Sequence, residues 1–383
     1  MPLAERDRNL TGTYVERVAN TPDMVARFVA IFQDHTAPSL VSNLVTDVEK
    51  IAVAGRSYPL SLNRRGQSGN CYICNPITAY IDYALDETRN FLAHPALRHA
   101  VRALIHACAP LVRASGLDGQ VQINNWLFST NPVPALNRDA VADLRDRLTQ
   151  DHPSRALVIR SLNDVADQDS LSALCAEGFR LLPARQIYLY GAEGAKIAPS
   201  SDIKRDLKAL AQTPHQAVEN AAFEDQDFAR CAELYEMLYV EKYTALNPRY
   251  TALYVKEMHR SGLMQLRGLR DPASGKLVAV TGLFENGRTL TQPIVGYDTT
   301  RPRAEGLYRM VMAMAQDHAR REGLFFNMSA GAAQFKRRRQ AMPVIEYNAV
   351  FVDHLSFGQR AAVRTMEEIL TRIGIPLLKR FEL

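Results

Sequence analysis

The sequence is poor in cysteine and lacks any long apolar run. It has five cysteines among 383 residues, and so sparse and odd a set excludes a disulfide framework and indicates reduced thiols. No stretch approaches the roughly 20 apolar residues that a membrane span needs, and no apolar segment of the signal-peptide kind follows the charged N-terminus. With 47% hydrophobic residues, the chain is predicted to be a globular, cytoplasmic protein without a membrane span.

Metal-binding patterns are equally scarce. Cys71 and Cys74 stand at the spacing of half a zinc or redox site, but no second cysteine pair and no His-x-x-x-His follows them. We favour a structural turn at this pair, with a metal or redox site as the alternative, and expect no metal.

Positive charge is concentrated in one run. The net charge is only +5, yet residues 336–339 read Lys-Arg-Arg-Arg. Such a run is usually a solvated helix face, but it also suits an anionic carrier. That carrier would be a coenzyme A nucleotide, an acyl-carrier protein or a tRNA.

Length and periodicity predict two α/β domains. At roughly 100 to 200 residues per domain the chain makes two, and strand-like segments alternate with helical periodicity, which predicts a mixed sheet covered by helices. The pattern weakens between residues 191 and 216, so we place the domains at 1–195 and 205–383. Residues 121–128, with the only tryptophan, are predicted to be a strand, and residues 376–383 a short extension after a helix.

The stretch 277–352 carries the clearest functional signal. It reads as a hairpin with an Asn-Gly turn, a loop containing Arg301 and Arg303, a helix, a strand, a basic helix and a last strand. A loop that enters a helix N-terminus presents unpaired N–H groups and a positive dipole, which favours anions. Arginine adds bidentate donors suited to phosphate.

This stretch resembles the GNAT superfamily of acyltransferases. The family's phosphate-binding signature, Gln/Arg-x-x-Gly-x-Gly/Ala, matches residues 301–306, with Ala304 in place of the first glycine and Gly306 at the last position. The surrounding order of strand, signature, helix and strand is also the family's. The resemblance implies that an acyl-thioester co-substrate, either acyl-coenzyme A or the phosphopantetheine arm of an acyl-carrier protein, binds this loop.

A second family pattern follows the next strand, and the chain departs from it. In Asn-x-x-Ala-x-x-(apolar)-Tyr-x-x-x-Gly, the alanine and the apolar residue are matched, but Lys336 replaces the tyrosine that commonly protonates the leaving thiolate. The chain is similar to a divergent branch related to Fem-type and tandem-GNAT transferases. This resemblance implies two GNAT-like domains in tandem, the N-terminal one degenerate.

The candidate residues fall into three groups. GNAT chemistry needs an amine to lose a proton and a thiolate to gain one. The catalytic candidates are Glu346, Tyr347, Lys336 and Ser329. The candidates for binding the thioester co-substrate are Val295, Tyr297, Arg301, Arg303, Ala304, Gly306 and Lys336. The candidates for the acceptor site are Asn327, Asn348, Trp126, Asn124 and Tyr72.

Alternatives remain open for the two principal candidates. Glu346 lies in a predicted strand, where a buried carboxylate is costly unless it is paired or used. It is either a general base or the partner of Arg337 or Lys336. Lys336 either contacts phosphate, which we favour, or acts on the thiolate. Strand alternation means that only one of Glu346 and Tyr347 faces the site.

The sequence thus predicts an N-acyltransferase that moves an acyl group from a thioester to the amine of a small molecule. One alternative is a Fem-like transferase that uses aminoacyl-tRNA, with the basic run contacting RNA phosphates. A second alternative is a non-catalytic binding or scaffold protein.

Overall fold

A computed structural model describes residues 19–66, 71–91, 94–191 and 197–382. A single mixed sheet of 11 strands runs through it in the order β1-β2-β3-β4-β11-β5-β10-β9-β8-β7-β6. Neighbouring strands are antiparallel except for the pairs β3–β4 and β9–β10. The strands are β1 Asp47–Val53, β2 Arg56–Leu62, β3 Gln120–Ile123, β4 Ala156–Asn163, β5 Arg180–Tyr190, β6 Gln216–Val218, β7 Gln265–Arg270, β8 Leu277–Asn286, β9 Thr289–Tyr297, β10 Phe325–Asn327 and β11 Met342–Phe351.

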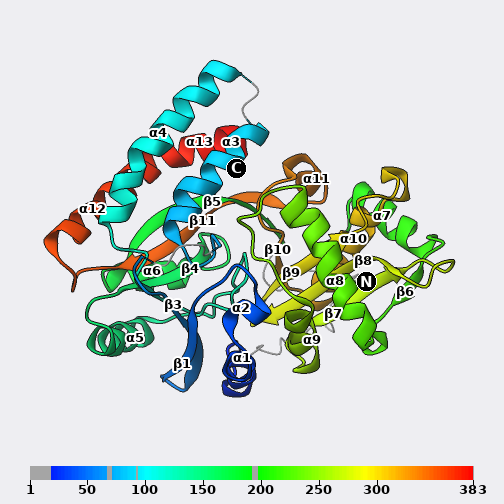
Figure 1. The fold of residues 1–383 in the computed structure, drawn as a ribbon, viewed down its shortest axis with the longest axis horizontal. Coiled ribbons are helices and arrows are strands. Elements are labelled where there is room, and N and C mark those ends of the chain that lie inside the picture. Colours follow the sequence, from blue (N-terminus) through cyan, green and yellow to red (C-terminus); the bar gives the residue numbers. More distant parts are fainter. Residues whose placement is uncertain (1–18, 67–70, 92–93, 192–196, 383) are drawn as a thin grey trace, which may run out of the picture.

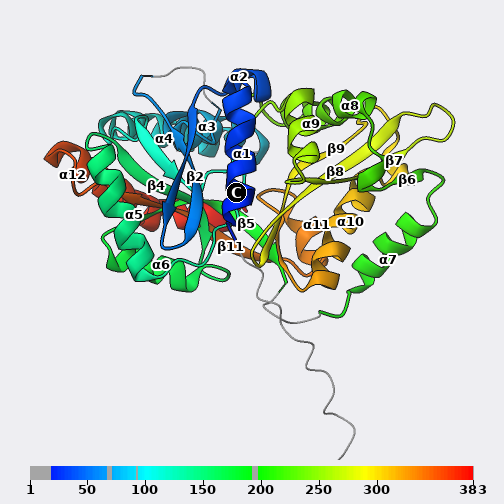
Figure 2. The same ribbon diagram turned by 90° about the horizontal axis from the view of Figure 1, so that it is seen from below.

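Helices cover this sheet in two groups that lie side by side (Figures 1 and 2). Those of the first part of the chain are α1 Pro22–Asp34, α2 Ala37–Leu40, η1 Thr78–Asp82, α3 Tyr83–Phe91, α4 Pro95–Ala114, α5 Arg138–Asp151 and α6 Gln168–Ala176. Those of the second part are α7 Ser201–Ala211, η2 Asn220–Ala222, α8 Asp225–Glu236, η3 Met237–Glu241, α9 Ala252–Arg260, η4 Arg303–Glu305, α10 Leu307–Glu322 and α11 Ala333–Arg338. The tail forms α12 Phe357–Ile369, η5 Leu370–Gly374 and α13 Ile375–Phe381. No helix in these described ranges has both the length and the apolarity to cross a membrane.

The last strand and the tail return to the first part of the chain. β11 lies between β4 and β5, and α12 packs on α4 and β5, at the left of Figure 2 near α4 and α5. β5 in turn joins the two groups, because it pairs with β11 on one edge and with β10 on the other. The two parts of the chain therefore share one sheet. The division between domains at residues 195–205 stays a prediction, and residues 192–196 lie outside the described ranges.

Two boundaries follow from local contacts, and the second of them, the Asn-Gly hairpin, was predicted. The Thr21 side chain accepts a hydrogen bond from the N–H of Met24 and caps α1, and Pro22 stands at the first helical position, where proline is favoured because its fixed φ suits the helix and no N–H is needed. The Asn-Gly hairpin joins β8 to β9, with Gly287 at a φ of +58°. Both boundaries follow from local backbone chemistry.

Two local predictions are wrong. The strand predicted at 121–128 ends at Ile123, because Asn124 and Leu127 have φ values of +59° and +58°. Beyond Ile123, side-chain amide oxygens accept hydrogen bonds from backbone N–H groups. Asn131 accepts from the N–H of Trp126, and Asn125 accepts from that of Leu127. The predicted extension after residue 376 is the helix α13.

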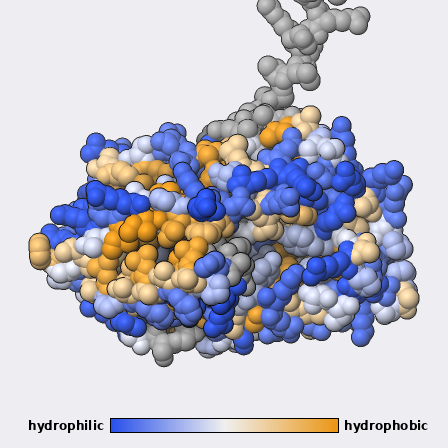
Figure 3. Space-filling model, turned by 90° about the horizontal axis from the view of Figure 1, so that it is seen from above, coloured by the Kyte–Doolittle hydropathy of each residue, from blue (hydrophilic) through white to orange (hydrophobic). Residues whose placement is uncertain are grey.

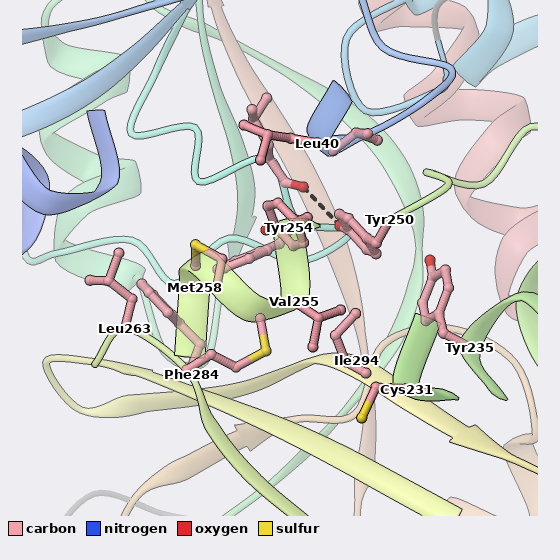
Figure 4. Packing of buried hydrophobic residues seen from close by; sticks show 14 of the residues in the cluster. Leu40, Cys231, Tyr235, Tyr250, Tyr254, Val255, Met258, Leu263, Phe284 and Ile294 are labelled. Carbon is pink, nitrogen blue, oxygen red and sulfur yellow. Dashed lines mark hydrogen bonds between the residues drawn. The ribbon is translucent and has the colours of Figure 1, made fainter. Parts of the chain in front are cut away.

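An apolar core joins the two groups of helices. α8 and α9 pack together, and Figure 4 shows Tyr235, Tyr254, Met258 and, from β8, Phe284 within one buried cluster. The Tyr250 hydroxyl donates a hydrogen bond of 2.8 Å to the carbonyl of Leu127, dashed in Figure 4. The loop after β3 is therefore anchored to the second part of the chain.

Gly296 allows α8 to lie directly on β9. A Cβ at this position would lie 2.4 Å from the carbonyl carbon of Leu234 and 2.5 Å from the nitrogen of Tyr235. Gly296→Ala is expected to lower the free energy of unfolding by about 1–3 kcal/mol, because rigid backbone must move to accept the methyl group. Gly358→Ala is the control, since a Cβ there meets no atom within 4 Å. Urea denaturation of both variants gives the comparison, and equal midpoints would show that α8 does not press on β9.

Candidate active site

The loop between β9 and α10 presents the start of a 16-residue helix. Gly306 precedes α10 with a φ of +69°, and a Cβ there would meet no atom of the described chain within 4 Å. The first N–H groups of a helix have no partner within it. Exposed Arg303 stands beside them. This end of α10 is therefore open and positive.

Ion pairs inside and below this loop hold its shape. Arg301 Nε lies 2.7 Å from Glu305 Oε2, and Arg301 Nη1 lies 3.6 Å from Asp271 Oδ2. Asp298 accepts hydrogen bonds from the N–H and hydroxyl of Thr300 and from Arg230. Burial alone would raise the pKa of Asp298, but these donors lower it. The loop is thus built around ionised carboxylates.

A cavity of about 320 Å³ lies beside this helix start. Its volume falls in the range of roughly 300–1,000 Å³ typical of small-molecule sites. Tyr308, the second residue of α10, lines it together with residues 329–332 and Lys336. The rest of its wall comes from η1, α3, α4, β5, η3 and the tail helices, so both parts of the chain enclose it. Figure 3 shows apolar side chains gathered around a hollow on the face where Figure 1 places α4 and the tail.

Lys336 is buried at one end of this cavity. Its side-chain nitrogen donates to the carbonyls of Ser329 at 3.0 Å and Ala330 at 2.7 Å, and the residue is 3% exposed. Burial, with a smaller contribution from the charge of Arg185, lowers the pKa of Lys336 to about 7. The amine can therefore take up or release a proton near neutral pH.

Comparison with known families gives one match, which covers the loop before α10. Residues 200–337 match the family described as an acetyltransferase (GNAT) domain. This range includes Lys336 and the loop of residues 298–306 between β9 and α10, called the anion loop below. The chain carries a GNAT domain. The resemblance predicted from the loop signature is confirmed. The comparison with curated proteins gives no match.

Solved structures extend the likeness beyond the GNAT domain. FemX matches with a TM-score of 0.53 at 8% identity, covering 91% of this chain and 97% of its own. The C-terminal domain of a putative lysylphosphatidylglycerol synthetase from Agrobacterium fabrum matches with a TM-score of 0.48 at 13% identity, covering 91% of this chain and 96% of its own. A tandem GNAT protein from the clavulanic acid biosynthesis pathway matches with a TM-score of 0.36 at 11% identity, covering 87% of this chain and 96% of its own. The predicted α/β fold is confirmed by the single mixed sheet, and FemX shares this fold.

Glu346 has a different partner from those expected. Its carboxylate pairs with Arg185 of β5, with Nε–Oε1 at 2.9 Å and Nη2–Oε2 at 3.3 Å, rather than with Lys336 or Arg337. Although burial opposes it, the charge of Glu346 raises the pKa of Arg185. Only the pairing of β11 with β5, which the sequence did not indicate, brings the two together.

A carboxylate that the sequence analysis missed faces the GNAT domain from α3. Glu87 lines the main cavity with Tyr80 and Tyr83. Burial raises the pKa of Glu87 to about 7, partly offset by a hydrogen bond from Tyr83 and the charge of Arg185. Tyr80, Tyr83 and Glu87 repeat at positions i, i+3 and i+7, which places them on one helix face. That spacing can be read from the sequence and could have indicated the shared face.

Several predicted residues lie near the cavities and others do not. Glu346 and Asn348 line a second cavity of about 100 Å³, together with Tyr72, which also lines the main one. Tyr347 lines neither cavity. The side chain of Asn348 donates to the hydroxyl of Tyr80 at 2.8 Å, so this part of β11 does face η1.

The predicted acceptor residues after β3 are in the core. Trp126 is fully buried between Phe28 and Phe284, with ring centroids 5.1 and 4.9 Å away. Its indole N–H donates to Asn124 Oδ1, and Asn124 in turn donates to the carbonyl of Pro132. Both residues hold the core together and neither lines a cavity.

The remaining predicted residues shape the walls of the site. Val295 is buried under α10, and the ring of Tyr297 lies 6.0 Å from that of Tyr308, which lines the cavity. Asn327 Oδ1 accepts from the N–H of Ser329, whose φ is +62°. Asn327 therefore stabilises the bend that presents two carbonyls to Lys336. Ala304 is exposed within the anion loop.

The basic run does not form the solvated face that its sequence indicates. Lys336 and Arg339 are buried, and Arg339 pairs with buried Asp206 at 2.5 Å. Arg337 and Arg338 are exposed, and Arg337 pairs with Glu382 at 2.6 Å. Two of the four charges therefore serve the interior.

The predicted structural role of the cysteine pair agrees with its surroundings. Cys71 and Cys74 are buried free thiols, and burial raises the pKa of Cys74 to about 11 and that of Cys71 further. Asn63 and Gln120 both donate to the carbonyl of Cys74. Within the described ranges no three His, Cys, Asp or Glu side chains group as metal ligands would.

Proposed function

We propose that this protein transfers an acyl group from a thioester, either acyl-coenzyme A or an acyl-carrier protein, to the amine of a small molecule. The observation that supports it is the meeting of three groups at one cavity: Tyr308, the second residue of α10, buried Lys336 and half-buried Glu87. An anion site beside two groups with pKa values of about 7 is what thioester aminolysis requires, since ideal acid–base groups titrate near the working pH.

The residues suit the two proton transfers. The Glu87 carboxylate takes a proton from the acceptor ammonium, and the freed amine attacks the thioester carbonyl. As the C–S bond breaks and the amide C–N bond forms, the ammonium form of Lys336 gives its proton to the departing thiolate. The second proton of the attacking nitrogen returns to the neutral amine of Lys336. The products are an amide and a free thiol, and the first amine proton rests on Glu87 until solvent removes it.

The anion loop suits the phosphates of the donor. The open N–H groups at the start of α10 and the exposed charge of Arg303 would contact them. Arg301, already paired with Glu305 and Asp271, would keep the loop in shape. Open space around Gly306 leaves room for the close approach of a phosphate.

Aminoacyl-tRNA is the second candidate donor, because FemX shares this fold and the chain resembles Fem-type transferases. Burial of Lys336 and Arg339 removes half of the basic run from an RNA surface. We therefore favour the thioester. A steep fall in affinity with salt would instead indicate tRNA, since each neutralised phosphate adds to the slope.

Coenzyme A is expected to stabilise the protein against heat. A ligand at about 100 times its dissociation constant adds roughly 2.7 kcal/mol to the free energy of unfolding, and Arg303→Ala is expected to reduce the shift in Tm while leaving the unliganded Tm unchanged. Differential scanning fluorimetry with coenzyme A and acetyl-coenzyme A gives the measurement. Exposed Arg364→Ala on α12 is the control. Equal shifts in both variants, or none in the wild type, would contradict binding at the loop.

A further inference from the structure

The main cavity extends well beyond the polar groups that the proposed reaction uses. Lys336, Glu87 and Arg185 lie in its wall together with α4 and the tail helices. The residues contributed by α4, by the end of α12 and by η5 are almost all apolar, among them Leu104, Ile105, Leu111, Ile369, Leu370 and Ile373. The cavity thus pairs charged groups with a long aliphatic lining.

This lining is not covered by other parts of the described chain. In the 20 residues of α4 only Ala109 and Val112 are buried, and no residue of η5 or α13 is. At the mouth, Leu104 is 38% exposed and Ile373 is 42% exposed. An apolar face of this kind, set around a hollow (Figure 3), marks a binding site.

The facing helices also limit the shape of an occupant. Residues of α4, η5 and α13 line the same cavity, and α4 packs against α12, so apolar side chains from several helices enclose the space. Its volume is that of a small ligand. An apolar space of this size with a cation and a carboxylate in its wall suits an alkyl chain attached to a polar head.

We propose that the space between α4 and the tail holds the long aliphatic chain of one of the two substrates, with its polar head at Lys336 and Arg185. This rests on the proposed acyl transfer and specifies its substrate class. The chain belongs either to a fatty acyl thioester or to a long-chain amine.

The first test measures binding without catalysis. A dansyl-labelled fatty acid is displaced from the full-length protein by octanoic, dodecanoic and hexadecanoic acid. Affinity is expected to rise with chain length, by up to roughly fourfold for each methylene that is fully buried. Ile105→Trp fills the space and is expected to weaken binding at least tenfold. Ala107→Trp, on the exposed face of the same helix, is the matched control and is expected to bind as the wild type does.

The second test separates the two sources of the chain. Transfer rates are measured with acetyl-, octanoyl- and hexadecanoyl-coenzyme A, and separately with ethylamine, octylamine and dodecylamine. If kcat/KM rises with acyl length and Ile105→Trp removes the rise, the chain is on the donor. The same pattern with the amines places it on the acceptor.

The failures of the two proposals are distinguishable. Fatty acid binding that Ile105→Trp abolishes, without any thioester turnover, would support the chain site and overturn the proposed reaction. Turnover that is independent of both chain lengths, with no displacement of the probe, would overturn the chain site and leave the reaction standing. Equal weakening by Ile105→Trp and Ala107→Trp would also overturn the chain site.

Discussion

Replacing Lys336 with methionine is expected to lower the rate of acyl transfer by roughly 10²–10⁴-fold, the usual contribution of a general acid or base. Methionine fills nearly the same volume, so the cavity and the KM for the thioester are expected to change little. The protein is expected to remain folded, because the substitution removes a buried amine whose charged form burial disfavours. Arg338→Met, at an exposed neighbour in the same helix, is the control.

The pH dependence assigns the roles of the two groups. Glu87 acts as a carboxylate, so the rate is expected to rise as pH increases through about 7, the pKa of Glu87. Lys336 acts as an ammonium, so the rate is expected to fall as pH increases through about 7, the pKa of Lys336. The wild type should therefore show a narrow bell. Lys336→Met is expected to lose the high-pH limb and Glu87→Gln the low-pH limb, and a Lys336→Met profile that keeps both limbs would refute the acid role.

Breaking the ion pair below the cavity is expected to give the largest loss of stability. Arg185→Met leaves the Glu346 carboxylate, 3% exposed, without its partner. Removing one member of a buried pair costs about 3–5 kcal/mol of unfolding free energy. The matched control is Arg337→Met, which breaks the more exposed pair with Glu382 and is expected to cost about 0–1 kcal/mol. Urea denaturation of both variants provides the measurement.

A second substitution tests the cause of that loss. Arg185→Met/Glu346→Leu removes both charges and is expected to recover most of the stability, because no unpaired charge remains. If the double variant is as unstable as Arg185→Met alone, packing rather than the unpaired carboxylate determines the loss. The charge of Arg185 also lowers the pKa of Lys336, so the high-pH limb of this variant is expected to move to higher pH.

Local chemistry explains what could be predicted at the site. The loop before α10 was recognisable because a strand, two arginines and a glycine precede a strongly periodic helix, and all of these signals lie within one short stretch. Lys336 was recognisable because it occupies the place of a tyrosine in a family pattern. Its burial was not, since the run of four cations to which it belongs is typical of a solvated face.

The acceptor side could not be predicted in the same way. Trp126 and Asn124 were predicted for the acceptor site because tandem units place ligands at their interface, yet a tryptophan beside amides also suits a core position in which each polar group finds a partner. Glu87 was overlooked because a glutamate in an amphipathic helix is usually solvated. It lies in a cavity wall only because α3, β5 and the tail helices line the same cavity.

The sequence alone determined the types of most helices and strands, the anion loop and the GNAT likeness, because caps, periodicity and turn residues act over a few positions. The tertiary structure decided that β11 crosses into the first part of the chain, that Glu346 pairs with Arg185, and that Lys336 and Glu87 share one cavity with an uncovered apolar space. Those outcomes depend on strand pairing between residues more than 150 positions apart, such as Glu346 with Arg185. Such pairings are selected by the packing of the whole molecule, and no local pattern encodes them.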